Sequence, residues 1–304
     1  MRIFGRRRIR RSTGEVVFDS LNALLMLLVA IVMIYPFWYV LVYALNNSQD
    51  ASSGHLWLWP RKITLENILF VINRPILQRA YLVTIARTIV GPIIHLVVTG
   101  FAAYALSKRS LPGRKAITYY LIVPMFIGAP LVATYVVYAR LHLLNNFLVY
   151  VLPGAFAFFM MAIARALFED IPASLEESAK MDGAGYMRIF FRLILPLSTP
   201  IVATILIFSA VGNWLDFFTN FVFVQSASLA TLQFLLFQIV SQNQAQSGVM
   251  GPMQIVSGST TDFRISTETV KATTLVVVTL PIIFIYPFFQ GYIIKGLLLG
   301  SIKE

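Results

Sequence analysis

A stretch without charged residues extends from Ser20 to Ser48, and further apolar stretches of similar length follow along the chain. About 20 apolar helical residues cross the roughly 30 Å hydrocarbon core of a bilayer. The chain is 58% hydrophobic and 12% charged, whereas soluble domains contain about 25% charged residues. The sequence therefore predicts an all-α integral membrane protein with six transmembrane helices, at about Leu21–Leu45, Tyr81–Ser107, Ala116–Ala139, Asn145–Phe168, Pro200–Val224 and Thr273–Leu297.

The amino terminus is strongly basic, with Arg2, Arg6, Arg7, Arg8, Arg10 and Arg11. The net charge of +11 would fit a nucleic-acid-binding protein, but a basic end directly before an apolar helix is typical of a topology signal. A cleaved signal peptide has an apolar region of about 7–15 residues, and the run after Asp19 is longer. We therefore expect a retained first helix and no nucleic-acid partner.

Basic residues in the loops predict the orientation of the chain. Lys108, Arg109, Arg114 and Lys115 lie between the second and third helices, on the same side as the basic amino terminus. Because positively charged loops remain in the cytoplasm, we expect residues 1–16 to form a cytoplasmic tail and residues 17–304 to form the transmembrane domain. Arg61 and Lys62 fall on the outer side, in a long segment where the rule is weaker.

Two long segments are predicted on the outer side. Asn46–Arg79 contains Trp57 and Trp59, which are typical of an anchor at the membrane interface. The apolar stretch Leu232–Val240 is too short to cross a bilayer, so we expect a helix that lies on the outer surface. The polar residues Ser241–Thr261 behind it predict a mobile loop.

The residues between the fourth and fifth helices, Glu169–Leu197, predict a helix–turn–helix on the cytoplasmic side. Pro172 suits the first turn of a helix, and Gly183 suits a helix end that needs a positive φ. Tyr186, Ile189, Phe190 and Leu193 then recur at helical spacing. A short helix with small and apolar faces is typical of an element that docks into a groove.

This segment contains a motif that resembles the EAA coupling loop of ABC importer permeases, Glu177-Ser178-Ala179-Lys180-Met181-Asp182-Gly183-Ala184 followed by Ile194-Leu195-Pro196-Leu197. Ser178 stands where the family has alanine, which exchanges one small residue for another. The resemblance extends to Ala103–Arg109 with Pro112–Arg114, and Gly212–Phe217 resembles helix five of the oligosaccharide permeases. The chain is similar to the smaller, six-helix permease subunit of maltose-type carbohydrate importers, which implies the type I ABC importer permease fold.

The resemblance implies a set of partners in a bacterial inner membrane. They are a second homologous permease, a cytoplasmic ABC ATPase dimer, an extracytoplasmic solute-binding protein and a carbohydrate substrate, which is expected to be an oligosaccharide. No G-x-x-x-x-G-K-[ST] phosphate loop occurs in the sequence, so ATP with Mg²⁺ is expected on the ATPase, and this chain is expected to bind no cofactor. The residues expected to couple to the ATPase are Glu177, Ser178, Ala179, Asp182, Gly183 and Ala184. The alternative is that the charges only stabilise a short solvated helix.

Polar residues in the fifth helix form the second candidate site. Asn213, Asp216 and Asn220 are spaced to share one helix face, and Trp214 lies beside them. An ionisable residue inside a membrane segment faces a cavity or a partner. The four residues are therefore candidates either for the substrate pathway or for packing against the second permease. Arg87, in the second helix, is expected to snorkel or to pair with an outer carboxylate, and His95 to be a packed, hydrogen-bonded residue.

Other function classes find less support in the sequence. An intramembrane enzyme needs a nucleophile–base pair or a metal set, but the chain has no cysteine, and His55, His95 and His142 lack metal-ligand spacing. A stand-alone channel or secondary carrier would not need a cytoplasmic docking loop. An ABC importer permease for a non-sugar solute shares the coupling loop and stays the closest alternative.

Overall fold

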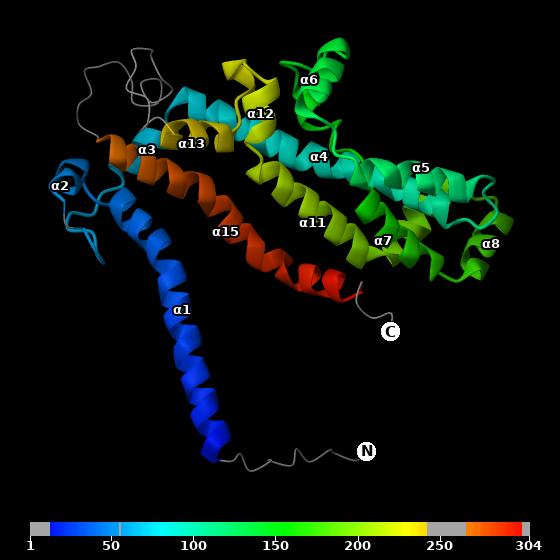
Figure 1. Ribbon diagram of the computed structural model, residues 1–304, viewed down its shortest axis with the longest axis horizontal. Helices are drawn as coiled ribbons and strands as arrows, with labels where there is room; N and C mark the ends of the chain where they lie inside the picture. Colours follow the sequence, from blue (N-terminus) through cyan, green and yellow to red (C-terminus); the bar gives the residue numbers. More distant parts are fainter. Residues whose placement is uncertain (1–12, 55, 242–265, 300–304) are drawn as a thin grey trace. The chain divides into compact units, whose positions relative to one another are not determined.

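The computed structural model describes residues 13–54, 56–241 and 266–299, and Figure 1 shows them as helices joined by short connections. Within these ranges the extended pairing is limited to one isolated bridge between Asn46 and Ile63. The chain divides into two compact units, one of residues 1–69 with 263–276 and the other of residues 70–262 with 277–304. The predicted all-α class is confirmed.

In its described residues the first unit contains four helical segments, namely α1 (Thr13–Leu45), α2 (Ser48–Ser52) and the first residues of α3 (Glu66–Ile72) and α15 (Thr267–Leu299). α1 includes the predicted first transmembrane segment, and most of its apolar side chains are exposed, as expected for a helix that contacts lipid. The amide of Asn67 donates to the main-chain oxygens of Ala44 and Asn46, at 3.0 and 2.8 Å, and so holds α3 to the end of α1.

Asp50 is the polar centre of the segment that follows α1. The amide nitrogen of Asn46 donates to Oδ2 of Asp50 at 2.9 Å, and Nε of Arg61 lies 3.0 Å from the same oxygen. The hydrogen bond from Asn46 and then the charge of Arg61 hold the pKa of Asp50 below its ordinary value, against the opposing effect of desolvation. Because the folded-state pKa is lowered, this contribution to stability is present above the unfolded pKa and is lost as the pH falls.

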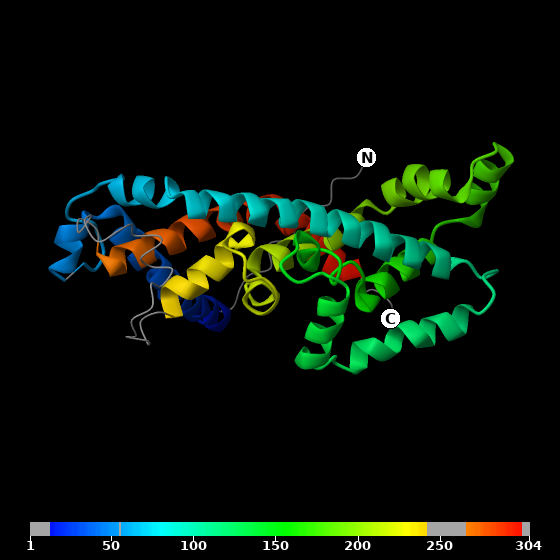
Figure 2. The ribbon, with the colours of Figure 1, turned by 90° about the horizontal axis from the view of Figure 1, so that it is seen from above.

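The second unit is organised around α4 (Pro75–Ser107), which packs along α11 (Thr199–Leu215) and α7 (Phe158–Glu169), as Figures 1 and 2 show. Pro75 lies in the first turn, where its missing N–H costs no hydrogen bond. With 33 residues and a rise of about 1.5 Å per residue, α4 is about 50 Å long and exceeds the hydrocarbon core. The buried residues Ala103 and Ala164 allow α4 and α7 to approach closely.

Four polar side chains of α4 lie on one face and are buried, namely Thr84, Arg87, His95 and Thr99. We call this set the polar stripe of α4. Gly91 lies on the same face, because its spacing to Arg87 and to His95 is four residues. The side chains of Arg87, His95 and Thr99 point toward the interrupted fourth and fifth predicted helices.

The third predicted transmembrane helix, Ala116–Ala139, is not continuous. It consists of α5 (Arg114–Phe126) and α6 (Leu131–Arg140), which are bent relative to each other by 118°, and Figure 2 shows the sharp change of direction. Gly128 and Pro130 lie between the two helices. Pro130 has no N–H to donate to the preceding turn, which is the physical reason why Ala116–Ala139 does not form the single helix that was predicted.

The fourth and fifth predicted helices are also interrupted. The fourth contains a 3₁₀ turn, η1 (Phe147–Tyr150), then non-helical residues through Ala157, and only then α7. Pro153 and Gly154 lie in the non-helical part, and both residues disfavour a continuous helix. The fifth helix ends as α11 at Leu215 and resumes as α12 (Phe218–Phe223).

The remaining predicted segments agree in position with the structure. α13 (Leu232–Ser241) covers the predicted outer-surface helix and follows the 3₁₀ turn η3 (Ala227–Leu229), while α15 contains the sixth predicted segment. The loop predicted over Ser241–Thr261 lies outside the described residues from residue 242 onward. In the described part of the chain, α1 and α4 are long and apolar enough to cross a membrane. The number is four if each of the bent pairs, α5 with α6 and Tyr186–Leu197 with α11, counts as one span.

The segment predicted to protrude as a helix–turn–helix contains α8 (Ala173–Met181), α9 (Tyr186–Ile189), a π-helical turn η2 (Phe190–Ile194) and α10 (Leu195–Leu197). We call Glu169–Leu197 the coupling segment. The φ of Gly183 is +78°, which confirms the prediction that this position requires glycine. Pro172 precedes the first turn of α8 instead of lying in it.

Phe190 anchors the coupling segment to α4. Its side chain is 0% exposed and stacks on Phe101, with the ring centroids 4.3 Å apart. A Cβ atom at residue 100 would lie 3.1 Å from the Phe190 ring, so Gly100 makes room for it. Phe190 is therefore a tightly packed contact between the coupling segment and α4.

Truncation of this anchor should destabilise the protein. Phe190→Ala leaves a cavity and is expected to lower the free energy of unfolding by about 3–5 kcal/mol, measured by chemical unfolding of the purified protein in detergent. The matched control is Phe191→Ala, because the Phe191 side chain is 49% exposed and should cost far less. Equal losses in the two variants would contradict the assigned anchor role.

Candidate functional site

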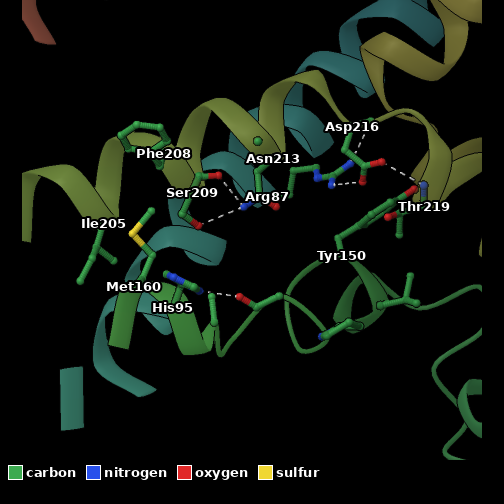
Figure 3. A pocket seen from close by; sticks show the side chains of 15 residues that line it. Arg87, His95, Tyr150, Met160, Ile205, Phe208, Ser209, Asn213, Asp216 and Thr219 are labelled. Carbon is green, nitrogen blue, oxygen red and sulfur yellow. Dashed lines mark hydrogen bonds and ion pairs between the residues drawn. The ribbon is translucent and has the colours of Figure 1, made fainter. Parts of the chain in front are cut away.

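A cavity of about 380 Å³ lies in the second unit, between α4, the segment from η1 to α7, and α11. Apolar side chains such as Met160, Ile205 and Phe208 form part of its wall (Figure 3). The polar side chains that line it are Arg87, His95, Tyr150, Ser209, Asn213, Asp216 and Thr219. A concave apolar space with a few convergent polar groups is the usual form of a binding site.

An ion pair between Arg87 and Asp216 lies at one end of the cavity, and Figure 3 shows the two side chains facing each other. Nη2 of Arg87 lies 2.6 Å from Oδ2 of Asp216, and Nη1 donates to the main-chain oxygen of Asp216 at 3.1 Å. The Arg87 side chain is 3% exposed and that of Asp216 is 26% exposed. Because a buried guanidinium cannot lose its proton, it depends on this carboxylate for compensation.

The break between α11 and α12 places Asp216 opposite Arg87. Its backbone N–H still donates to the main-chain oxygen of Gly212 at 3.1 Å, but its backbone is extended and α11 ends. Oδ1 of Asp216 accepts the N–H of Thr219, in the first turn of α12, at 3.1 Å. Aspartate favours such local side-chain-to-backbone bonds over helix continuation. One carboxylate thus accepts an N–H from the first turn of α12 and neutralises Arg87.

Tyr150 covers the other side of the Arg87 guanidinium. The guanidinium carbon lies 4.5 Å from the centre of the Tyr150 ring, a geometry that stabilises a desolvated cation by about 2 kcal/mol. The Tyr150 hydroxyl donates to the main-chain oxygen of Leu229 at 2.8 Å, so the ring is held in place. Nε of Arg87 has no hydrogen-bond partner in the described part of the chain.

The next two residues of the polar stripe bond to the backbone of the interrupted fourth helix. Nδ1 of His95 lies 2.7 Å from the main-chain oxygen of Gly154 (Figure 3), and it donates because a carbonyl oxygen only accepts. The Thr99 hydroxyl donates to the oxygen of Ala155 and accepts from the N–H of Ala157, both at 3.4 Å. The expectation that His95 is a packed, hydrogen-bonded residue agrees with this geometry.

Asn213 contributes an amide to the cavity from α11. Its nitrogen donates to the main-chain oxygen of Ser209 at 2.9 Å. A Cβ atom at residue 91 would lie 2.8 Å from this nitrogen, so Gly91 allows α4 to approach α11 here. The side chain is therefore fixed at the cavity wall by its own helix and by the glycine opposite.

The candidate residues of the fifth helix separate into two groups. Asn213 and Asp216 line the cavity, whereas Trp214 and Asn220 are 7% and 1% exposed and do not line it. Asn220 accepts the N–H of Thr231 at 2.7 Å and donates to the oxygen of Val224 at 3.1 Å, which stabilises the connection to α13. The prediction of one common helix face was wrong, because α11 ends before Asp216.

Sequence reasoning underestimated Arg87. Of its two expected placements, pairing with a carboxylate is the one that the structure has, and snorkelling was wrong because the side chain is buried. A signal was present, since Arg87 and Asp216 are the one charged residue in the second and in the fifth predicted helix. Ionisable residues inside a bilayer usually pair with each other.

The coupling segment presents most of its predicted docking residues on the surface. Glu177, Ser178, Asp182 and Gly183 are exposed, and Ala179 and Ala184 are half-buried. The N–H of Ala184 donates to the oxygen of Ala179 at 2.9 Å, which closes the turn around Gly183. Exposed apolar side chains, Met181, Tyr186 and Met187, surround the turn. This surface has the composition of a protein-docking element.

Glu176 is a residue of the coupling segment that sequence reasoning missed. It is 8% exposed and forms an ion pair with Lys108, which follows the last turn of α4. Nζ of Lys108 also lies 4.3 Å from the centre of the Tyr104 ring. α8 is therefore attached to the end of α4 by a partly buried charge pair. No local sequence pattern predicts the pair of Glu176 and Lys108, because the two residues are 68 positions apart.

Comparison with protein families assigns the chain to a family of membrane transport proteins. The family model described as binding-protein-dependent transport system inner membrane component matches residues 96–298. The chain belongs to this family. The matched range includes the whole coupling segment and the cavity residues from Val149 to Thr219, whereas Arg87 and His95 precede it. The resemblance based on the EAA-like motif is therefore confirmed.

Individual relatives cover nearly the whole chain. The polygalacturonan/rhamnogalacturonan transport system permease protein YtcP of Bacillus subtilis (strain 168) is 32% identical over 94% of this chain and 98% of its own length. Protein LplC of the same organism is 32% identical over 94% of this chain and 95% of its own length. A chain in the crystal structure of a bacterial ABC transporter involved in the import of the acidic polysaccharide alginate is 27% identical, with a TM-score of 0.83 and coverage of 93% of this chain and 99% of that one.

Removal of the charge on Asp216 should destabilise this membrane component strongly. Asp216→Asn keeps an oxygen for the Thr219 N–H but leaves Arg87 buried without a counter-charge, so we expect a loss of about 3 kcal/mol in the free energy of unfolding in detergent. The control is Arg61→Gln, which removes an ion pair whose arginine side chain is 44% exposed and should cost about 0–1 kcal/mol. If Asp216→Asn lowered the free energy of unfolding no more than Arg61→Gln does, the buried pair would not stabilise the fold more than an exposed one.

Proposed function

We propose that this permease is one of two related membrane subunits of an ATP-driven importer, and that its cavity lies on the pathway of a carboxylate-bearing oligosaccharide. The observation that carries the proposal is the buried Arg87–Asp216 pair at the wall of the cavity. Charges at such depth are expensive, and they mark substrate pathways when they line a cavity.

The chemistry of Arg87 supports an acidic cargo. An arginine binds a carboxylate through a planar fork of N–H donors, and such charge-assisted bonds are roughly twice as strong as neutral ones. Asp216 accepts from two of these donors, through its main-chain oxygen and its carboxylate, so an entering carboxylate would compete with Asp216 for the same guanidinium. The similarity to a polygalacturonan/rhamnogalacturonan permease and to a transporter of acidic alginate is consistent with this cargo.

The remaining polar groups of the cavity suit a sugar. The Asn213 amide and the Ser209 hydroxyl offer donors and acceptors for sugar hydroxyls, and Tyr150 and Phe208 offer aromatic surface. We assign Asn213 and Asp216 to the pathway. Trp214 and Asn220 are buried within this chain and support this wall without lining it.

The proposed source of energy is a cytoplasmic ATPase dimer that hydrolyses ATP with Mg²⁺ and docks on the coupling segment. The exposed turn around Gly183, with Glu177, Ser178 and Asp182 and the adjoining Ala179 and Ala184, is the proposed contact. The sequence has no phosphate-binding loop of its own. An extracytoplasmic solute-binding protein would deliver the sugar on the opposite side, and the basic residues 1–11 and 108–115 would then face the cytoplasm.

Arg87 can be tested by comparing charged and neutral cargo. The complete importer, reconstituted in vesicles with its partner subunits, should lose apparent affinity for an acidic oligosaccharide by about tenfold or more in Arg87→Gln, because one charge-assisted bond contributes about 1.5–3 kcal/mol. The methyl ester of the same oligosaccharide is the matched control, and its uptake should change much less. An equal loss for acid and ester would contradict carboxylate recognition by Arg87.

The docking role of the turn predicts uncoupling. Gly183→Asp places a side chain at a positive φ and into the proposed ATPase contact, so we expect the reconstituted importer to hydrolyse ATP without uptake of sugar. The control is Gly185→Asp, two residues away, because φ there is −74° and aspartate suits this cap of α9. Normal transport by Gly183→Asp would exclude the proposed contact.

A further inference from the structure

A second cavity, of about 720 Å³, lies away from the substrate cavity, between the connection from α4 to α5, the first two turns of α5, and α7. Four basic residues line it, namely Arg109, Arg114, Lys115 and Arg165. We call this cavity the basic pocket. The proposed transport mechanism does not use it.

The positive charge of the basic pocket is only partly compensated. Arg114 and Arg165 both form ion pairs with one carboxylate, Glu169, at the end of α7. Arg109 and Lys115 are exposed and take part in none of the ion pairs of the described residues. Two of the four cations thus pair with one carboxylate, and the pocket has the charge of an anion-binding site.

The start of α5 adds to this preference for an anion. Gly113, with φ of +71°, precedes the helix, and the N–H groups of Lys115 and Ala116 belong to its first turn. N–H groups in the first turn of a helix lack intrahelical partners, and the helix dipole is positive there. Both residues line the basic pocket, so the main chain and the side chains favour the same sign of ligand.

An apolar stripe leads away from the basic pocket along α5. Tyr119 lines the pocket and lies four residues after Lys115, so the two share a helix face. Val123 and Phe126 continue this face, and Tyr119, Val123 and Phe126 are 69%, 51% and 76% exposed. A soluble anion would use the basic pocket alone, whereas an amphiphile would contact the pocket and the stripe together.

We propose that the basic pocket binds the headgroup of an anionic glycerophospholipid whose acyl chains lie along Tyr119, Val123 and Phe126. Phosphate is recognised by arginine forks and helix N-termini, and basic pockets between membrane helices on the cytoplasmic side suit anionic headgroups. The apolar stripe supplies the second part of the ligand. The site does not depend on the identity of the transported sugar.

The test measures lipid retention by native mass spectrometry of the complete importer, titrated with phosphatidylglycerol or phosphatidylcholine. We expect phosphatidylglycerol to bind with clear preference, and Arg109→Gln with Lys115→Gln to weaken it by about thirtyfold, the scale of two basic residues near a membrane surface. The matched control, Arg188→Gln with Arg192→Gln, removes two exposed basic residues of the coupling segment that do not line the pocket, and should retain the lipid.

Two further measurements separate the sources of the anion. Val123→Asn should weaken the binding of phosphatidylglycerol but not that of glycerol 3-phosphate, because it changes the apolar stripe alone.

Three outcomes would each overturn the proposal. They are equal binding of both phospholipids, an unchanged lipid affinity in the double variant, and binding of glycerol 3-phosphate as tight as that of the lipid. Loss of the ATPase from the double variant with unchanged lipid binding would assign the pocket to protein docking instead. The unfolding midpoint of each variant in phosphatidylcholine shows whether it is folded.

Discussion

The second unit depends on the requirement that backbone polar groups find partners inside the membrane. A bilayer core has no water to satisfy an open N–H or carbonyl, so irregular backbone is tolerated there only when protein groups bond to it. The polar stripe of α4 supplies such groups. Thr84 accepts the N–H of Leu232 at the start of α13, Arg87 donates to the oxygen of Asp216, and His95 donates to the oxygen of Gly154. One regular helix therefore stabilises the breaks in three other segments.

These breaks also create the cavity. Had the fourth and fifth segments been continuous helices, their backbones would have been saturated and packed side by side. Instead the residues before α7 leave the helical path, α11 ends at Leu215, and the cavity opens between them and α4. The same constraint that makes Arg87, His95 and Thr99 necessary for stability thus places polar groups on a wall where a sugar can meet them.

The sequence predicts the regular parts of this fold better than the irregular ones. The spans of α1, α4 and α15 follow from hydropathy, and the positive φ of Gly183 follows from a motif with helix signals on both sides. Hydropathy cannot detect the breaks at Gly128, Gly154 and Asp216, because apolar residues continue through them. Whether a proline or glycine interrupts a membrane helix depends on a partner for the freed backbone groups, and here the partner is more than 50 positions away in the sequence, as with His95 and Gly154.

Predicting the cavity residues needs this same long-range information. Asn213 and Asp216 were found because polar residues in an apolar helix are conspicuous, but Trp214 and Asn220 are equally conspicuous and are buried by packing. Which of these residues line the cavity depends on how α11 packs on α4 and on the break between α11 and α12. Arg87 was visible as a lone charge, yet its partner could be chosen only once α4 and α11 were known to pack together.

α4 connects the cavity to the coupling segment mechanically. Arg87 lies in its amino-terminal half, whereas Phe101, Tyr104 and Lys108 at its carboxyl end hold Phe190 and Glu176 of the coupling segment. Because a hydrogen-bonded helix with a buried face is stiff along its axis, a displacement of the coupling segment that preserves these contacts must move the end of α4 as well. The Arg87–Asp216 pair joins α4 to the connection between α11 and α12. A shift of α4 relative to α11 would therefore change the distance between Arg87 and Asp216. A charge pair between two helices responds to such a shift, whereas a pair within one helix would not.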